Sequence, residues 1–149
     1  MEFTGPHVVK LDKWISPAPF EKLLNMTIHK SEKGEALLSM PFYYQYAQGA
    51  GLLHGGAIIS LADTAVAMAM KSVLEENTHF ATIEVNARFL YPVKKGMVKA
   101  YAKVTPDSEK ERIFNGIAEV FNEEKIKVLD FSSVFKIARN SKIIYPTLT

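Results

Sequence analysis

The sequence predicts an α+β domain in which one antiparallel sheet packs against a single long helix. Two observations support this fold class. In the stretch 57–74, 13 of 18 residues are apolar, which indicates a long helix. Four extended runs rich in Val, Ile, Phe, Tyr and Ala follow it, separated by short polar turns. Because such turns are too short for parallel crossovers, the strands are expected to pair antiparallel.

The residues before the long helix predict a short helix and two strands. A proline opens the stretch 19–24, and proline suits the first turn of a helix. Extended runs at 26–29 and 35–42 flank a polar turn at 30–34. A glycine-rich loop, 48–56, then leads into the long helix.

The second half of the chain is expected to form four strands joined as consecutive hairpins. These strands are predicted at 82–91, 97–105, 113–121 and 126–137. The breaks between them fall at 92–96, 106–110 and 122–125. Short connections of this kind favour hairpins between strands that are neighbours in sequence.

The long helix is unusual because its apolar residues cover the whole cylinder and not a single stripe. A helix of this kind is buried on most sides. A flat sheet covers only one side of a helix. The sequence therefore predicts a sheet that curls around the helix, and a second copy of the chain that covers what remains.

Composition sets the class of protein. The chain has 149 residues, 48% of them hydrophobic and 23% charged, which suits one folded domain with a substantial core. With no cysteine there is no disulfide, no thiolate nucleophile and no zinc–thiolate site. A net charge of +2 does not indicate a nucleic-acid binder.

The N-terminal residues and the longest apolar stretch bear on the membrane. The start carries an acid at Glu2 and has no apolar run after a basic region, unlike a secretory signal. The apolar stretch 57–70 contains Asp63 and is shorter than a membrane-spanning helix requires. We therefore expect a cytoplasmic protein with no membrane partner.

Asp63 is the first candidate catalytic residue, because it lies in the middle of a helix predicted to be buried. Burial of a carboxylate is costly and raises its pKa toward the range of a general base. The alternative is a structural Asp whose carboxylate is bonded to a nearby hydroxyl, such as that of Ser60 or Thr64. The helix pattern alone does not choose between these two interpretations.

Gly55 and Gly56 begin the same helix and are the second candidate feature. The free N–H groups and the dipole at a helix N-terminus favour developing negative charge, and glycine lets a ligand approach. Together these properties describe an oxyanion hole for an acyl carbonyl. The alternative is a tight turn that needs glycine only for its backbone conformation.

The separation of these two features predicts a dimer. Gly55 and Asp63 are eight residues apart, which is about 12 Å along a helix axis. One carbonyl group cannot be close to both. Two antiparallel copies of the helix across a two-fold axis could pair Gly55 of one chain with Asp63 of the other.

The motif His54-Gly55-Gly56, followed after a short spacer by Leu61-Ala62-Asp63-Thr64, resembles the hotdog-fold thioesterases of the phenylacetate-degradation type. The run from Thr82 to Pro92 resembles the strand that follows the central helix in that family. The resemblance covers about residues 35–138, with 1–34 as an N-terminal extension of a single domain over 1–149. It implies a curled antiparallel sheet around one helix, a double-hotdog dimer that often forms tetramers, and hydrolysis of acyl-CoA thioesters.

The resemblance also implies roles for individual residues. The oxyanion donor of the family falls on Gly55 and its carboxylate on Asp63. Gln48 takes the position, 15 residues before the carboxylate, where nearer relatives have Asn. Thr82 is the best match to an assisting hydroxyl on the next strand, one residue further along than the family spacing. The remaining motif residues that would contact substrate are His54, Gly56 and Thr64. His54 has two interpretations, of which bracing of the loop is favoured over proton transfer.

Charge is distributed unevenly along the chain. Basic residues outnumber acidic ones by 12 to 7 over residues 88–149, whereas acidic residues dominate before that. Lys94, Lys95 and Arg112 are therefore candidates to contact the phosphates of coenzyme A. The alternative is that these side chains are solvated and guard strand edges.

Other site types are not supported by the sequence. The glycine loop has Ala57-Ile58 where a phosphate-binding loop needs Lys-Ser/Thr, and it lacks the third glycine of a dinucleotide-binding motif. There is no Gly-x-Ser-x-Gly nucleophile elbow, and the four histidines show no metal-ligand spacing. We expect no metal and no cofactor other than the coenzyme A of the substrate.

The sequence thus favours an acyl-CoA thioesterase in which Asp63 is a general base or a nucleophile. An alternative from another class is a non-catalytic acyl-CoA-binding module on the same fold. Burial of a carboxylate destabilises the folded protein, and a protein that only binds acyl-CoA has no need of it, which favours the enzyme. A hotdog dehydratase would need a histidine paired with an acidic residue, and the sequence shows no such pairing.

Overall fold

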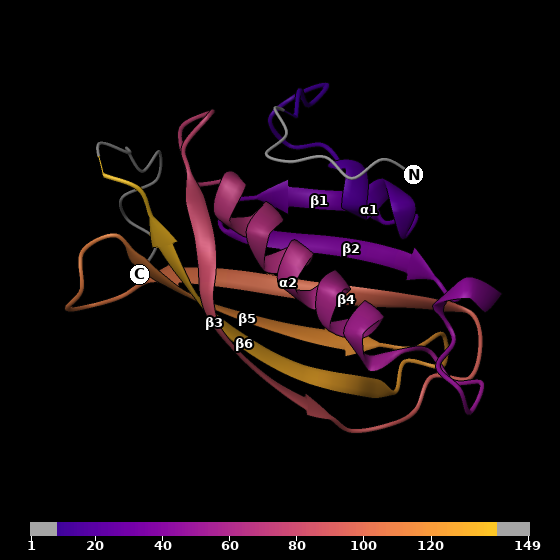
Figure 1. Cartoon of the computed structure of the whole chain (residues 1–149). Helices are drawn as coiled ribbons and strands as arrows, with labels where there is room; N and C mark the ends of the chain where they lie inside the picture. Colours follow the sequence, from indigo (N-terminus) through magenta and orange to yellow (C-terminus); the bar gives the residue numbers. More distant parts are fainter. Residues whose placement is uncertain (1–8, 140–149) are drawn as a thin grey trace.

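The computed structural model describes residues 9–139, which form one six-stranded sheet around one long helix (Figure 1). The elements in chain order are α1 (Pro19–Leu23), β1 (Thr27–Glu32), β2 (Glu35–Pro41), the 3-10 helix η1 (Tyr44–Tyr46), α2 (Gly55–Lys71), β3 (Phe80–Phe89), β4 (Met97–Pro106), β5 (Ile113–Phe121) and β6 (Lys127–Ile137). The predicted α+β class with a single antiparallel sheet is confirmed. The ends of the predicted domain, 1–8 and 140–149, lie outside the described residues.

The sheet has the order β1-β2-β4-β5-β6-β3, and every neighbouring pair is antiparallel. It curls so that all six strands contact α2 (Figure 1). The sheet already begins with β1, inside the segment 1–34 predicted as an extension. The curl predicted from the all-round apolar character of the helix is therefore present.

The core lies between α2 and the inner faces of the central strands. Side chains on β4 and β5 alternate between buried and exposed, as a half-buried sheet requires. The inner residues of these two strands are small or medium-sized, apart from Phe114. At Gly116 a methyl group would come within 2.3 Å of Val66 on the helix, so glycine is required for this close approach. The helix ends at Lys71, short of the predicted Leu74, and the chain stays buried beyond it.

The first hairpin has a shorter turn than predicted. The predicted turn 30–34 is in fact a two-residue turn at Lys33 and Gly34, whose φ values are 49° and 78°. Positive φ at both central residues matches the twist of the flanking strands. Polar residues that resemble a turn in the sequence, such as Ser31, instead extend β1, which is an edge strand and largely exposed.

The prediction that β3 and β4 form a hairpin is wrong. Within residues 9–139, β3 pairs only with β6, whereas β4 lies between β2 and β5. The connecting segment 90–96 crosses the end of the sheet, and the Val93 carbonyl accepts a 2.9 Å hydrogen bond from the Leu53 amide. Pro92 and Gly96 suit either kind of connection, so local turn chemistry could not reveal the crossover. The hairpins β4–β5 and β5–β6 are confirmed.

None of the helices within residues 9–139 is long and apolar enough to cross a membrane.

Candidate active site

The side of α2 next to β3 is only partly covered by the sheet. The half-buried helix positions Ser60, Asp63 and Ala67 lie three or four residues apart and so share one face. β3 itself contains no buried residue, although several of its side chains are large and apolar. The candidate site residues lie along this open side of the helix and at its N-terminus.

Asp63 occupies the middle of the open side, and its carboxylate is held by β3. The Thr82 hydroxyl donates a 2.8 Å hydrogen bond to Asp63 Oδ1. Burial raises the pKa of Asp63 from its ordinary value of 3.8, and the bond from Thr82 opposes this rise only in part. The hydroxyl that satisfies the carboxylate therefore comes from the next strand. Ser60, a structural candidate in the sequence, donates instead to the Gly56 carbonyl oxygen at 2.8 Å.

A β-bulge helps to aim Thr82 at the helix. Thr82 pairs with Phe135 on the inner face of the sheet, and the register shifts before Glu84, which pairs with Val134. The extra residue, Ile83, is left exposed. Bulges of this kind often redirect a side chain beside an active site. Thr64, the motif residue next to Asp63, stays half-buried on α2.

His54 is the N-cap residue of α2. Its ring Nδ1 accepts a 2.8 Å hydrogen bond from the Gly56 amide, and its carbonyl oxygen accepts from the amides of Ala57 and Ile58. These contacts agree with the interpretation that His54 braces the loop. These contacts also distinguish Gly55 from Gly56, because the Gly56 amide already donates its hydrogen bond to the His54 ring. The Gly55 amide has no acceptor among residues 9–139 and is the donor left for a ligand.

Gly55 lies in the wall of a cavity of about 380 Å³. The other lining residues are Gln48, Leu52, Leu53, Ile58, Phe89, Leu90, Tyr91, Pro92 and Val93. A methyl group at Gly55 would lie 3.0 Å from the Phe89 ring, so a larger residue there would push that ring away from the start of the helix. A mostly apolar cavity with one free amide in its wall suits an acyl group with a carbonyl at one end.

Gln48 also lines this cavity, and it builds the glycine loop. The side-chain oxygen of Gln48 accepts hydrogen bonds from the backbone amides of Ala50 and Leu52. The backbone amide of Gln48 donates to the Leu52 carbonyl at 2.8 Å. The side-chain NH₂ group of Gln48 has no partner among the described residues. Gln48 can therefore offer a donor beside Gly55 while its oxygen keeps the loop closed.

The structure brings the four predicted catalytic residues together in two pairs and not as one group. Gln48 and Gly55 share the cavity at the start of α2, whereas Asp63 and Thr82 are bonded to each other in the middle of the helix. Asp63 and Thr82 do not line the Gly55 cavity. The unbroken helix between Gly55 and Asp63 keeps the separation of about 12 Å that an eight-residue spacing predicts.

The three predicted phosphate-binding residues are also divided. Lys94 and Lys95 line a cleft of about 180 Å³ with Glu123 and Glu124, and this cleft adjoins the Gly55 cavity through residues 91–92. Arg112 lies elsewhere, in a separate pocket.

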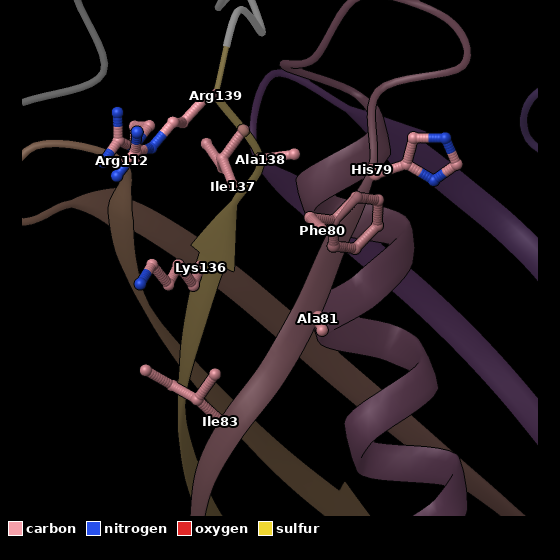
Figure 2. A pocket seen from close by; sticks show the side chains of 9 residues that line it. All are labelled: His79, Phe80, Ala81, Ile83, Arg112, Lys136, Ile137, Ala138 and Arg139. Atoms are coloured by element: carbon pink, nitrogen blue, oxygen red, sulfur yellow. The ribbon is translucent and has the colours of Figure 1, made fainter.

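That pocket also contains two basic residues that the sequence did not single out, Lys136 and Arg139 (Figure 2). The pairing of Ile113 with Lys136 brings them close to Arg112, and it is known only once the strand register is known. Within residues 9–139, no three His, Asp or Glu side chains gather as a metal site would need.

Comparisons with known proteins point to thioesterases and esterases. The profile of the thioesterase superfamily matches residues 50–106, which include α2, β3 and β4. A candidate esterase of Pasteurella multocida is 39% identical over 80 residues, which are 52% of this chain and 58% of that protein. ComA2, a candidate esterase of Bacillus subtilis, is 33% identical over 81 residues, or 54% of this chain and 64% of its own length. The chain thus matches about three fifths of the length of these relatives.

Solved structures show the same fold. The PaaI protein of Escherichia coli, from the phenylacetic acid degradation operon, is 26% identical with a TM-score of 0.71, and the match covers 80% of this chain and 83% of that one. A Haemophilus influenzae thioesterase is 24% identical with a TM-score of 0.71, covering 80% and 82% of the two chains. The curled sheet around one helix is the hotdog fold.

Proposed function

Because residues 50–106 match the thioesterase superfamily and the chain has the hotdog fold, we propose that it hydrolyses acyl-CoA thioesters to a free acid and coenzyme A. One observation carries the proposal: α2 contributes two reactive features. Its half-buried carboxylate, Asp63, accepts a hydrogen bond from Thr82 of β3, and its first amide, at Gly55, is free to bind an oxyanion. A carboxylate with a raised pKa and a free helix N-terminus are the two groups that thioester hydrolysis needs.

In the proposed reaction the Gly55 amide polarises the thioester carbonyl while Asp63 of the partner chain activates water. The water oxygen attacks the carbonyl carbon as its proton passes to the carboxylate. The tetrahedral intermediate then collapses, the C–S bond breaks, and the proton is returned to the leaving thiolate. Burial raises the pKa of Asp63, which makes the carboxylate a stronger base than one in water. In the alternative route Asp63 attacks directly, and water hydrolyses the resulting mixed anhydride.

The proposal includes a homodimer, because the two halves of the site are too far apart within one chain. β3 is an edge strand, and its exposed apolar residues include Val85 and Phe89, which are 48% and 52% exposed. A second copy on the open side would cover these side chains and could place its Gly55 beside Asp63. A tetramer built from two such dimers, and a cytoplasmic location, belong to the same proposal.

The test is the variant Asp63→Asn, assayed by release of free thiol from a panel of aryl- and alkyl-CoA esters. We expect kcat to fall by about 10²–10⁴-fold, the usual contribution of a general base, while acyl-CoA binding persists. Ser60→Ala is the matched control, because Ser60 is half-buried on the same face and bonds only within the helix. Turnover that survives in Asp63→Asn would remove Asp63 from the mechanism.

The same variant is expected to be more stable than the wild type, which guards against loss of activity through unfolding. The pKa of Asp63 is raised in the folded state, so the folded protein holds the proton more tightly than the unfolded chain does. Stability therefore falls as the pH rises from about 3.8 through the raised folded pKa. Above that interval Asp63→Asn should unfold at a higher temperature, and the gain should disappear in acid.

The non-catalytic alternative has a distinct outcome in the same assay. A wild-type protein that binds coenzyme A esters and releases no thiol above background from any ester of the panel would be an acyl-CoA-binding module. Esters on carrier proteins belong in the panel, because they share the phosphopantetheine arm with coenzyme A.

A further inference from the structure

A basic pocket of about 410 Å³ lies where the start of β3 meets the start of β5 and the end of β6 (Figure 2). Figure 2 shows Arg112, Lys136 and Arg139 on the side of the pocket where β5 and β6 run together. The apolar part of the lining is formed by Phe80, Ala81, Ile83, Ile137 and Ala138. The pocket therefore offers a charged side and an apolar surface to one ligand.

Within residues 9–139, no carboxylate neutralises the positive charge of this pocket. None of the described residues that line it is acidic. The ion pairs found within residues 9–139 involve only Lys30 and Lys127 as cations, so Arg112, Lys136 and Arg139 have no carboxylate within ion-pair distance there. Like charges gathered in this way repel one another, and an anionic ligand bound between them would relieve the repulsion.

The pocket lies at the same end of β3 as the Asp63–Thr82 pair. Ala81 and Ile83, which line the pocket, are the sequence neighbours of Thr82. Lys136 lies directly opposite Ala81 on β6, and Phe135 lies opposite Thr82. At about 3.3 Å per residue, Thr82 is only about 7 Å from the first residue of β3. Thr82 faces the helix, whereas Ala81, Ile83 and Lys136 are exposed, so a long ligand with its reactive end at Asp63 would reach the pocket by passing over the end of the strand.

We propose that this pocket binds the phosphorylated adenosine end of coenzyme A. The three cations would hold the phosphates, with the two guanidinium groups as bidentate partners. The apolar surface that includes Ile83 would contact the adenine ring. This inference rests on the proposed function, since it assigns a place to the part of the substrate furthest from the thioester.

The cleft at Lys94 and Lys95 is the competing location, and its chemistry is less favourable. Glu123 and Glu124 line it as well, so its local charge is close to balanced. The Glu123 carboxylate is fixed there by a 3.1 Å hydrogen bond from the Met97 amide. A phosphate in this cleft would meet carboxylates, whereas in the Arg112 pocket it would meet cations.

The test compares two double variants that remove the same charge, Arg112→Gln/Lys136→Gln and Lys94→Gln/Lys95→Gln. Each is assayed with one acyl group carried on coenzyme A, on N-acetylcysteamine and on a carrier protein. For acyl-CoA we expect KM to rise about fivefold per lost cation, and therefore about twenty-fivefold in the Arg112/Lys136 variant. The N-acetylcysteamine ester has no nucleotide, so its kcat/KM should be unchanged. The Lys94/Lys95 variant should match the wild type with acyl-CoA.

A second readout does not depend on hydrolysis. Adenosine 3′,5′-bisphosphate should bind the wild-type protein and Asp63→Asn equally, and it should bind Arg112→Gln/Lys136→Gln at least about tenfold more weakly. The single variant Lys136→Gln should weaken nucleotide binding in the same direction but by less. Because Lys136 is exposed on a strand, this variant is expected to stay folded and so controls for unfolding.

Several outcomes would overturn the inference while the proposed function stands. They are an unchanged KM for acyl-CoA in the Arg112/Lys136 variant, an equal loss on the N-acetylcysteamine ester, a loss confined to the Lys94/Lys95 variant, or a loss confined to the carrier-protein ester. Absence of thiol release from every ester would instead contradict the proposed function. In that case nucleotide binding would still decide the role of the pocket.

Discussion

β3 and β4 are equally long but lie in opposite environments. Each strand has ten residues. β4 lies between two strands, and its residues alternate strictly between buried and exposed for most of its length. β3 is the last strand of the sheet and has no buried residue, yet it carries Ile83, Val85 and Phe89, which are all about half exposed.

The difference shows which part of the molecule is complete within one chain. Edge strands are usually protected by charged residues, bulges or proline, and long apolar edges invite pairing with another chain. On β4 the outward side chains include Lys99 and Lys103, as expected of a solvated face. The large apolar side chains of β3 are typical of a buried strand, but a single chain leaves them about half exposed. The side of α2 that carries Asp63 is the side left for a partner and a substrate.

The largest effect is expected when a charge is placed on β3. Val85→Lys should prevent association through the open side, because a lysine there would have to be buried against the second copy. Without the Gly55 of the partner chain, thioester turnover should fall by about 10²-fold or more, the usual effect of losing an oxyanion donor. Light scattering after gel filtration and the thiol-release assay measure the two effects.

The matched control places the same charge on a central strand. Ile117 on β5 is 58% exposed, so Ile117→Lys alters an equally accessible apolar residue away from the open side. We expect this variant to keep both the dimer and its activity. A Val85→Lys protein that is monomeric and fully active would show that one chain contains a complete site.

A second prediction concerns the closed side of the helix, where there is no space left. Gly116→Ala would put a methyl group 2.3 Å from Val66 Cγ1, and the β-branched valine has little freedom to move away. Overpacking of this kind should lower the free energy of unfolding by about 1–3 kcal/mol, measured by urea denaturation.

Two comparisons make that prediction specific. Gly49→Ala meets no atom within 4 Å, so it should change stability by no more than about 0.5 kcal/mol. The double variant Gly116→Ala/Val66→Ala should recover part of the loss, because it removes the methyl group that the new Cβ would contact. An equal cost for the alanine substitutions at Gly116 and Gly49 would contradict close packing on this side.

Those parts of the fold that depend on local pattern were predictable from the sequence. The length and apolar character of α2 reveal a buried helix, and the extended run predicted at 113–121 matches the bounds of β5. The position of β3 next to β6 was not predictable, because Pro92 and Gly96 suit a hairpin as well as a crossover.

The candidate site shows the same limit. Asp63 could be found because a mid-helix carboxylate among apolar residues is unusual, and Gly55 because it starts the helix. The occupied amide of Gly56 and the free amide of Gly55 could not be distinguished, since this depends on the orientation of the His54 ring. Lys136 and Arg139 were missed because strand register, and not sequence distance, brings them to Arg112.

The smallest expected effect is a shift in pH dependence that tests how β3 contributes to the site. The hydrogen bond from Thr82 favours the ionised form of Asp63 and lowers its pKa, against the larger opposite effect of burial. Thr82→Val removes the bond and keeps the shape, so the pKa of Asp63 should rise further. Because the base must be ionised, the acid limb of kcat/KM should move to higher pH.

Thr82→Ser provides the control for this shift, since it restores the hydroxyl without the methyl group. Its acid limb should stay close to that of the wild type, whereas Thr82→Val should lose activity mainly on the acid side and recover as the pH rises. An acid limb that is identical in both variants would mean that β3 does not tune the carboxylate. In that case the open side of the helix would contribute Asp63 alone, and the strand would serve only as the surface on which a second chain docks.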